Sequence, residues 1–139
     1  MGILSKAKTK IVFVGIGGVG GYYGGLVSHY AENNPDIAVC FVARGANLEA
    51  IRENGLQVSD EHRRFVTHPA IATAKVEDIG KADYIVLTTK SYDLDATMRQ
   101  IKPMVSPRTI ILPLLNGIDN TARLRAFFPD NEVWYGCVY

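Results

Sequence analysis

A glycine-rich turn near the start of this 139-residue chain is the clearest candidate for chemistry. Gly15, Gly17 and Gly20 form a G-x-G-x-x-G pattern directly after the apolar residues 11–14. Where a strand leads into a helix, this spacing is typical of a dinucleotide pyrophosphate site. The first glycine allows a tight turn, the second lets the backbone approach the phosphates, and the third lets the helix pack closely on the strand. The N–H groups at the helix N-terminus then bind the anion without a basic side chain.

A purely structural turn is the alternative, because glycine-rich turns also occur for conformational reasons alone. The position of the motif, between a strand-like run and a helical stretch at 19–31, favours the cofactor interpretation. Gly21, Gly24 and Gly25 continue into that helix, where each costs about 1 kcal/mol relative to alanine. We expect close approach of the helix to the sheet or to a second domain to offset this cost.

Arg44 follows the next strand-like run, residues 37–43. In NAD-binding sheets an acidic residue at the end of the second strand binds the ribose hydroxyls. An arginine at that place pairs instead with the 2′-phosphate of NADP(H), and no carboxylate stands there to repel it. Such a charge-assisted contact is worth roughly 1.5 to 3 kcal/mol, or about ten- to a hundredfold selectivity. The pattern therefore predicts NADP(H) over NAD(H), with an arginine in a solvated loop as the alternative.

Two later strand-like runs also end in polar residues. Lys90 follows residues 83–88, and Asn116 follows residues 109–115. Because the carboxyl ends of the strands line the binding crevice of an open α/β sheet, we expect Lys90 and Asn116 to face the same cofactor. A lone lysine after a strand is usually only solvated, so this interpretation depends on its occurrence together with the glycine motif and Arg44.

These features, in this order, resemble the ketopantoate reductase family over nearly the whole chain. The resemblance is carried by the glycine motif, the Ala-Arg-Gly strand end at 43–45, the Thr-Lys-Ser-Tyr-Asp segment at 89–93 and the Leu-Asn-Gly turn at 115–117. It implies an NADPH-dependent reduction of 2-dehydropantoate to (R)-pantoate, a step of pantothenate and coenzyme A biosynthesis. The implied cofactor contacts are Gly15, Ile16, Gly17, Gly18, Val19, Gly20, Arg44, Lys90 and Asn116. Asn116 is implied to contact the substrate as well.

The same resemblance places the catalytic lysine in a helical C-terminal domain that this sequence does not contain. Lys90 matches the cofactor lysine of the family rather than the catalytic one, so no catalytic residue is expected in residues 1–139. The implied chemistry of the full protein is hydride transfer from the nicotinamide to a ketone carbon, with a lysine hydrogen-bonding or protonating the carbonyl oxygen. We therefore expect residues 1–139 to form an NADP-binding domain that binds the cofactor without turnover.

Other functions stay open on the sequence alone. One is a different dehydrogenase of the 6-phosphogluconate-like or opine type, because substrate specificity would lie in the absent domain. Another is a non-enzymatic module that senses NADP, since a fold by itself does not define a function. A methyltransferase is disfavoured, because its ligand prefers an acidic partner near the ribose and Arg44 has the wrong charge. As partners we expect a small 2-keto acid, no nucleic acid and no membrane, with a homodimer left open.

The elements needed to position these residues follow from hydrophobic periodicity and turn residues. The predicted strands are 11–14, 37–43, 83–88, 109–115 and 132–139, with a hairpin from 56–58 and 64–66. The predicted helices are 19–31, 47–54, 93–104 and 120–128. Strands that alternate with helices indicate a Rossmann-like α/β fold, a doubly wound and mainly parallel sheet with helices on both faces. No internal repeat or linker divides the chain.

Composition excludes several classes of protein. A net charge of +1 and 47% hydrophobic residues indicate a globular domain and disfavour nucleic-acid binding. No apolar run approaches the roughly 20 residues of a membrane span, and we expect a cytoplasmic protein. Cys40 and Cys137 fit no C-x-x-C pattern and are expected to be buried reduced thiols. His29, His62 and His68 have no metal-ligand spacing, so no metal site is expected.

Overall fold

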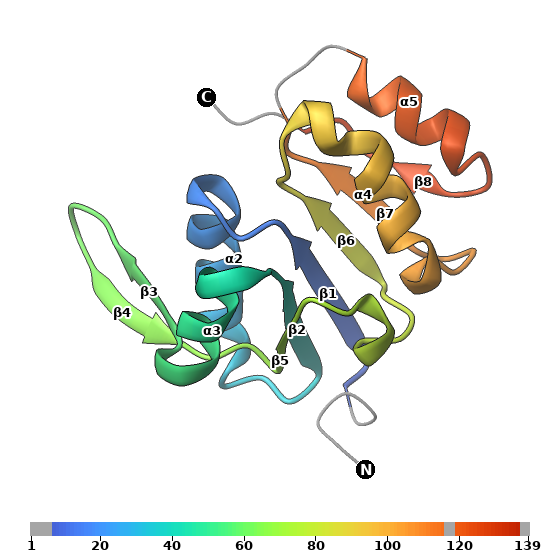
Figure 1. Cartoon of the computed structure of the whole chain (residues 1–139). Coiled ribbons are helices and arrows are strands. Elements are labelled where there is room, and N and C mark those ends of the chain that lie inside the picture. Colours follow the sequence, from blue (N-terminus) through green and yellow to red (C-terminus); the bar gives the residue numbers. More distant parts are fainter. Residues whose placement is uncertain (1–6, 116–118, 137–139) are drawn as a thin grey trace.

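The central sheet has six parallel strands in the order β5-β2-β1-β6-β7-β8 (Figure 1). The computed structural model describes residues 7–115 and 119–136. The strands of this sheet are β1 (Thr9–Val14), β2 (Ile37–Val42), β5 (Ile71–Thr73), β6 (Tyr84–Leu87), β7 (Ile110–Pro113) and β8 (Glu132–Val133). This is the doubly wound order of dinucleotide-binding sheets, and it confirms the predicted Rossmann-like α/β fold.

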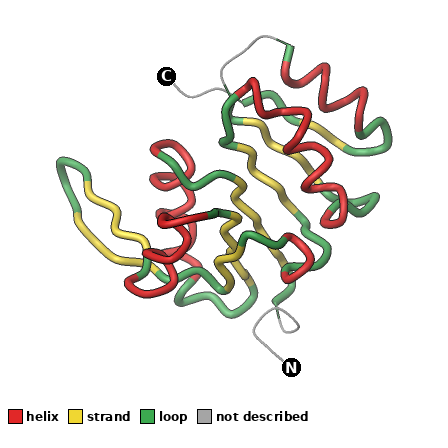
Figure 2. Tube along the Cα trace, in the orientation of Figure 1, coloured by secondary structure: helices red, strands yellow, loops and turns green. Residues whose placement is uncertain are grey.

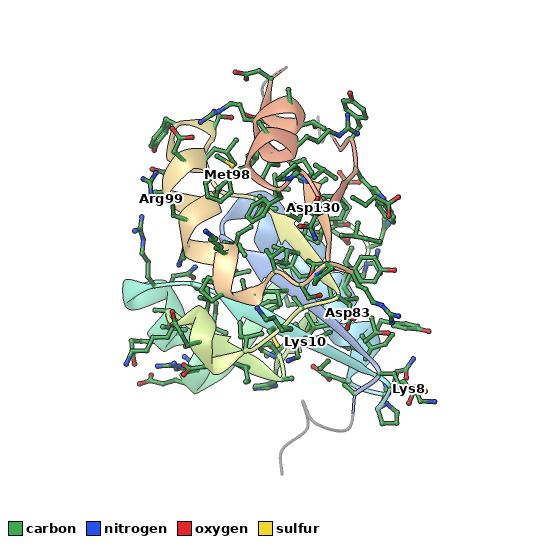
Figure 3. The ribbon with its side chains drawn as sticks, turned by 90° about the vertical axis from the view of Figure 1, so that its right-hand side faces the viewer. Lys8, Lys10, Asp83, Met98, Arg99 and Asp130 are labelled. Atoms are coloured by element: carbon green, nitrogen blue, oxygen red, sulfur yellow. The ribbon has the colours of Figure 1, made fainter. Side chains whose placement is uncertain are left out.

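Helices pack on both faces of the sheet (Figure 2). They are α2 (Gly18–Ala31), α3 (Gly45–Asn54), α4 (Leu94–Ile101) and α5 (Asn120–Phe127). Successive side chains of a strand point to opposite faces, so Phe13 joins the apolar cluster of α2 and α3 whereas Val12 and Val14 join that of α4 and α5. On α4, Met98 is buried against the sheet while the neighbouring Arg99 is exposed (Figure 3).

The glycines inside α2 allow the close approach that the sequence predicts. A Cβ at Gly24 would lie 3.2 Å from ring atoms of both Phe13 and Phe41, in β1 and β2. A Cβ at Gly25 would collide with Val58 in the antiparallel hairpin of β3 (Leu56–Ser59) and β4 (Arg64–Thr67). The helix therefore rests closely on the sheet on one side and on the hairpin on another.

The predicted helices are confirmed, with changes at their ends. The stretch 93–104 is divided into α4 and two short 3-10 segments, η2 (Ser91–Asp93) and η3 (Lys102–Met104). Helix α3 begins at Gly45, two residues before the predicted start, and ends before Gly55, whose φ of +78° suits a residue without a Cβ. A third 3-10 segment, η1 (Val76–Asp78), precedes β6.

Two strand predictions need correction. Strand β5 was not predicted, because its three residues are too few to show an alternating pattern. The final strand, predicted over 132–139, comprises Glu132–Val133 among the described residues. Residues 137–139 lie outside them.

Pro113 explains why β8 is short. The N–H groups of Ile110 and Leu114 point to β6, and the Ile111 carbonyl accepts a hydrogen bond from Trp134 on the β8 side. By alternation the nitrogen of Pro113 faces β8, but proline has no N–H to donate, so the ladder stops there.

Cys40 is fully buried in β2, as predicted, and desolvation raises the pKa of its thiol to about 11. Cys137 lies outside the described residues. Within the described ranges, no group of three or more His, Cys, Asp or Glu side chains is arranged to hold a metal ion. A search of the same residues for a membrane-spanning helix finds none that is long and apolar enough.

Candidate cofactor-binding site

The carboxyl ends of β1, β2 and β6 meet at a cavity of about 410 Å³. Its walls come from the glycine turn, the start of α3, the residue after β5, the end of β6 and one face of α4. The lining residues are Val14, Gly15, Ile16, Gly17, Val42, Ala43, Arg44, Asn47, Ala74, Thr88, Thr89, Lys90, Asp93, Ala96, Thr97 and Gln100. A crevice at the carboxyl ends of these strands is where open α/β sheets bind ligands. A second cavity of about 590 Å³, near the end of α2, contains none of the predicted site residues.

The glycine turn has the backbone geometry of an anion cradle. Gly15 has a φ of +91°, a conformation that residues with a Cβ rarely adopt, and its N–H donates to the Val42 carbonyl at 3.1 Å. Gly17 and Gly18 are exposed, and a Cβ built on either meets no atom within 4 Å. The backbone at these two positions is therefore open to a ligand.

Gly20 differs from Gly17 and Gly18, because it packs against the turn instead of facing open space. A Cβ at Gly20 would collide with the Gly15 carbonyl oxygen and the Thr88 hydroxyl. The third glycine of the motif thus permits the close helix packing that the sequence predicts. The single O–H of Thr88 is shared between the Val14 carbonyl, at 3.0 Å, and the Gly15 carbonyl, which joins the end of β6 to the end of β1.

The N-terminus of α2 begins at this turn. The first hydrogen bond of the helix runs from the Gly21 N–H to the Gly17 carbonyl at 2.8 Å. The N–H groups of the preceding residues have no acceptor within the helix, and no acidic side chain occupies its first turn. The positive end of the helix dipole is therefore available to a phosphate group.

Arg44 and Lys90 are exposed and line the same cavity. Arg44 precedes α3 in an extended conformation, with φ −147° and ψ 165°, directly after β2. Within residues 7–115 and 119–136, no carboxylate lies within ion-pair distance of its guanidinium. Lys90 precedes η2, after the end of β6. The two cations therefore approach the cavity from the ends of β2 and β6, the strands on either side of β1.

Three of the predicted site residues that the structure describes do not line this cavity. Gly18, Val19 and Gly20 continue from the turn into α2, so any contact they make with a ligand is through main-chain N–H groups. Asn116 lies outside the described residues, so its predicted place beside the cofactor is not tested.

Several lining residues were missed by the sequence reasoning. Asp93, Thr97 and Gln100 come from one face of η2 and α4, and their i, i+4, i+7 spacing is a signal that could have found them. Ala74 follows the unpredicted β5 and had no such signal. Asn47, predicted as the first residue of a helix but not as a site residue, lies in the first turn of α3, where its side chain donates to the Ile16 carbonyl at 2.6 Å.

The arrangement suits an elongated anion. Two cationic side chains and a helix N-terminus surround a cavity within the size range of small-molecule sites, about 300 to 1,000 Å³. Asp93 is the one acidic residue among the lining residues that the structure describes. The site can therefore bind and orient a phosphorylated ligand.

Comparison with known proteins identifies a family and similar structures. The family model described as ketopantoate reductase PanE/ApbA matches residues 11–139. The 2-dehydropantoate 2-reductase of Mesorhizobium japonicum is 32% identical over 136 residues, which cover 90% of this chain and 40% of the relative. The crystal structure of 2-dehydropantoate 2-reductase from Porphyromonas gingivalis has 44% identity and a TM-score of 0.88, over 94% of this chain and 46% of that chain. The chain thus spans less than half the length of these relatives.

One further solved structure bears on the choice of cofactor. The ternary structure of D-mandelate dehydrogenase with NADH and anilino(oxo)acetate has 27% identity and a TM-score of 0.77, over 93% of this chain and 40% of that chain. Proteins similar to this chain therefore include a dehydrogenase bound to NADH.

Proposed function

Because this chain belongs to the ketopantoate reductase PanE/ApbA family, a family of nicotinamide-dinucleotide-dependent reductases, we propose that it is the NADP(H)-binding domain of an NADPH-dependent 2-keto acid reductase. The proposed reaction is the conversion of 2-dehydropantoate to (R)-pantoate, the activity named for its relatives. The observation that carries the proposal is the convergence of the glycine turn, Arg44 and Lys90 on one cavity.

We assign the residues of the cavity to different parts of the cofactor according to their charge and position. The turn at Gly15, Ile16 and Gly17, with the first N–H groups of α2 at Gly18, Val19 and Gly20, would bind the pyrophosphate. Arg44 would bind the 2′-phosphate at the end of β2. Lys90 and Asn116 would contact the cofactor from the ends of β6 and β7, and Asn116 would also contact the substrate. The open backbone at Gly17 and Gly18 fits the close approach that a pyrophosphate requires.

A bound nicotinamide cofactor supplies the hydride in this chemistry, and the described residues would bind and orient it. We propose that the proton donor is a lysine in a helical domain that follows residue 139 in the full-length protein. The chain's coverage of 40 to 46% of its relatives supports this division.

Incomplete cover of the sheet face that carries α2 also supports a following domain. Among the described residues, the helical side chains in the apolar cluster on this face come from α2 and α3, near β1 and β2. Leu112 and Leu114, at β7, are partly exposed on the same face, and Trp134 beyond β8 is 43% exposed. Parallel sheets are normally covered on both faces, so this half requires a further cover.

Cofactor preference provides the direct test. We expect Arg44→Ala to lower the affinity for NADPH about ten- to a hundredfold and to change the affinity for NADH little, because NADH has no 2′-phosphate. Calorimetric titration at matched salt measures both affinities. Arg64→Ala, which removes an exposed arginine of β4 outside the cavity, is the matched control. Equal weakening of both cofactors by Arg44→Ala would refute the proposed role of Arg44.

Substrate choice is tested in the full-length protein. We expect oxidation of NADPH with 2-dehydropantoate by the full-length protein, and cofactor binding without turnover by residues 1–139. A reductase of another 2-keto acid is the second candidate, favoured by the similarity to D-mandelate dehydrogenase. Faster turnover of the 2-keto acid that corresponds to mandelate would support this second candidate. Cofactor binding without turnover of any 2-keto acid by the full-length protein would point to an NADP-sensing module.

A further inference from the structure

One side chain joins the two halves of the cofactor cavity. The Nδ2 of Asn47 donates to the main-chain carbonyl of Ile16 at 2.6 Å. Asn47 lies in the first turn of α3, three residues after Arg44, and Ile16 lies between the first two glycines of the motif. Both residues line the cavity. The bond therefore connects the segment assigned to the 2′-phosphate with the turn assigned to the pyrophosphate.

The direction of the Ile16 carbonyl matters for anion binding. An anion cradle presents main-chain N–H groups to its ligand, and a carbonyl oxygen that turned toward the phosphates would repel them. In this turn both successive carbonyls accept a hydrogen bond from a side chain. The Gly15 carbonyl accepts from Thr88, and the Ile16 carbonyl accepts from Asn47. Both oxygens are thus held by the protein.

Apolar side chains also pack where the glycine turn contacts the start of α3. The Ile16 side chain is 7% exposed and belongs to one apolar cluster with Ala43 and Leu48. These contacts keep the glycine turn beside the start of α3, but they do not fix the rotation of the peptide that follows Ile16. The amide of Asn47 is the described group that binds this carbonyl, and hence the one that sets its direction.

We propose that Asn47 is a positioning residue that holds the glycine turn in its anion-binding conformation. The inference rests on the proposed function of the cavity as an NADP(H) site. It assigns Asn47 to the pyrophosphate half of the site, although the residue belongs to the same helix turn as Arg44. Loss of the Asn47 amide should therefore weaken every ligand that has a pyrophosphate, whichever ribose substituent the ligand carries.

The test uses three ligands. For Asn47→Ala we expect the affinities for NADPH and NADH to fall by the same factor, about three- to tenfold, which corresponds to one hydrogen bond. Adenosine 2′-monophosphate has the ribose phosphate but no pyrophosphate, and its affinity should stay within about twofold of wild type. Arg44→Ala should give the opposite pattern, with NADPH and adenosine 2′-monophosphate weakened and NADH spared. A residue with a purely structural role would not separate the ligands in this way.

Two further variants complete the experiment. Asn54→Ala, the same substitution at the exposed last residue of α3, should leave all three affinities unchanged. Asn47→His retains an N–H donor near the same distance from the backbone and should bind NADPH more tightly than Asn47→Ala. Equal binding by Asn47→His and Asn47→Ala would contradict a hydrogen-bonding role.

The remaining outcomes separate this inference from the proposed function. If wild type binds NADPH and Asn47→Ala binds it equally well, the inference is overturned and the cofactor assignment stands. If Asn47→Ala weakens adenosine 2′-monophosphate as much as NADPH, the assignment to the pyrophosphate half is wrong. A folded wild-type chain that binds neither dinucleotide would overturn the proposed function and, with it, the role of Asn47.

Discussion

At the scale of single residues, Gly17 and Gly20 show that the glycines of one motif meet different constraints. Space around Gly17 is open, so its lack of a side chain is not required by packing. Gly20 faces the Gly15 carbonyl, a backbone atom that cannot move aside without distorting the turn. We therefore attribute Gly17 to ligand approach and Gly20 to folding.

This difference leads to opposite expectations for two variants. Gly17→Val should lower the free energy of unfolding by no more than about 1 kcal/mol, because the new side chain meets no atom and only the preference for glycine at a helix N-cap is lost, but it should abolish binding of NADPH and NADH. Gly20→Ala should lower the free energy of unfolding by about 1 to 3 kcal/mol through overpacking. Urea unfolding and calorimetric titration measure the two effects. A Gly17→Val chain that still binds NADPH, or a Gly20→Ala chain as stable as wild type, would contradict these roles.

At the scale of elements, Glu32 fastens the end of α2 to the hairpin strand β4. Its carboxylate accepts hydrogen bonds from the Thr67 hydroxyl at 2.5 Å and from the His68 N–H at 2.9 Å. Thr67 is fully buried and also pairs with Ser28 of α2 at 2.8 Å. The hydrogen bond from Thr67 is the largest cause of a lowered pKa at Glu32.

A lowered carboxyl pKa links this contact to pH. Because folding favours the ionised form, the contribution is present above the ordinary pKa of 4.5 and is lost as the pH falls through the lower pKa of the folded state. Glu32→Gln should therefore reduce stability at pH 7 by about 1 kcal/mol, a value discounted because the side chain is exposed. The difference from wild type should shrink as the pH falls from 7 to well below 4.5.

Thermal unfolding at the two pH values measures this effect. Glu61→Gln changes an exposed glutamate in the hairpin turn and serves as the control for the loss of one negative charge. A difference between Glu32→Gln and wild type that stayed constant from neutral to acidic pH would show that the charge of Glu32 does not support the contact.

At the scale of the whole molecule, the cavity proposed for the cofactor exists only when distant segments are assembled. Its walls combine residues from the glycine turn, α3, the end of β6 and α4, which span positions 14 to 100. A ligand that binds there binds the folded chain and not the unfolded one. NADPH binding should therefore stabilise the entire domain.

We expect NADPH at about 100 times its dissociation constant to stabilise the fold by about 2.7 kcal/mol, which raises the Tm on the order of 10 °C. NADH at the same concentration should raise it less, because Arg44 gains no phosphate partner. Differential scanning calorimetry measures the shift. Gly17→Val provides the control, and an equal rise in this variant would place the ligand outside the cavity.

Local patterns in the sequence predicted much of the architecture. The runs at 11–14 and 37–43 are apolar because strands of a parallel sheet are buried on both faces, and they appear as β1 and β2. The glycine spacing placed the turn at the start of α2, and Gly55 marked the end of α3. Lys90 was assigned to the cofactor from the rule for strand ends and Arg44 from its place after the second strand, and both line one cavity.

Local patterns thus established the order of elements and put polar and charged residues at the strand ends, because burial and backbone conformation leave signals in composition and period. Tertiary structure alone decided which groups meet. β1 lies between β2 and β6, so the turn at Ile16 meets Asn47 on one side and Thr88, more than 70 positions away, on the other. It also ended β8 at Val133, which pairs with Ile111. Such contacts depend on strand adjacency, which no local period encodes.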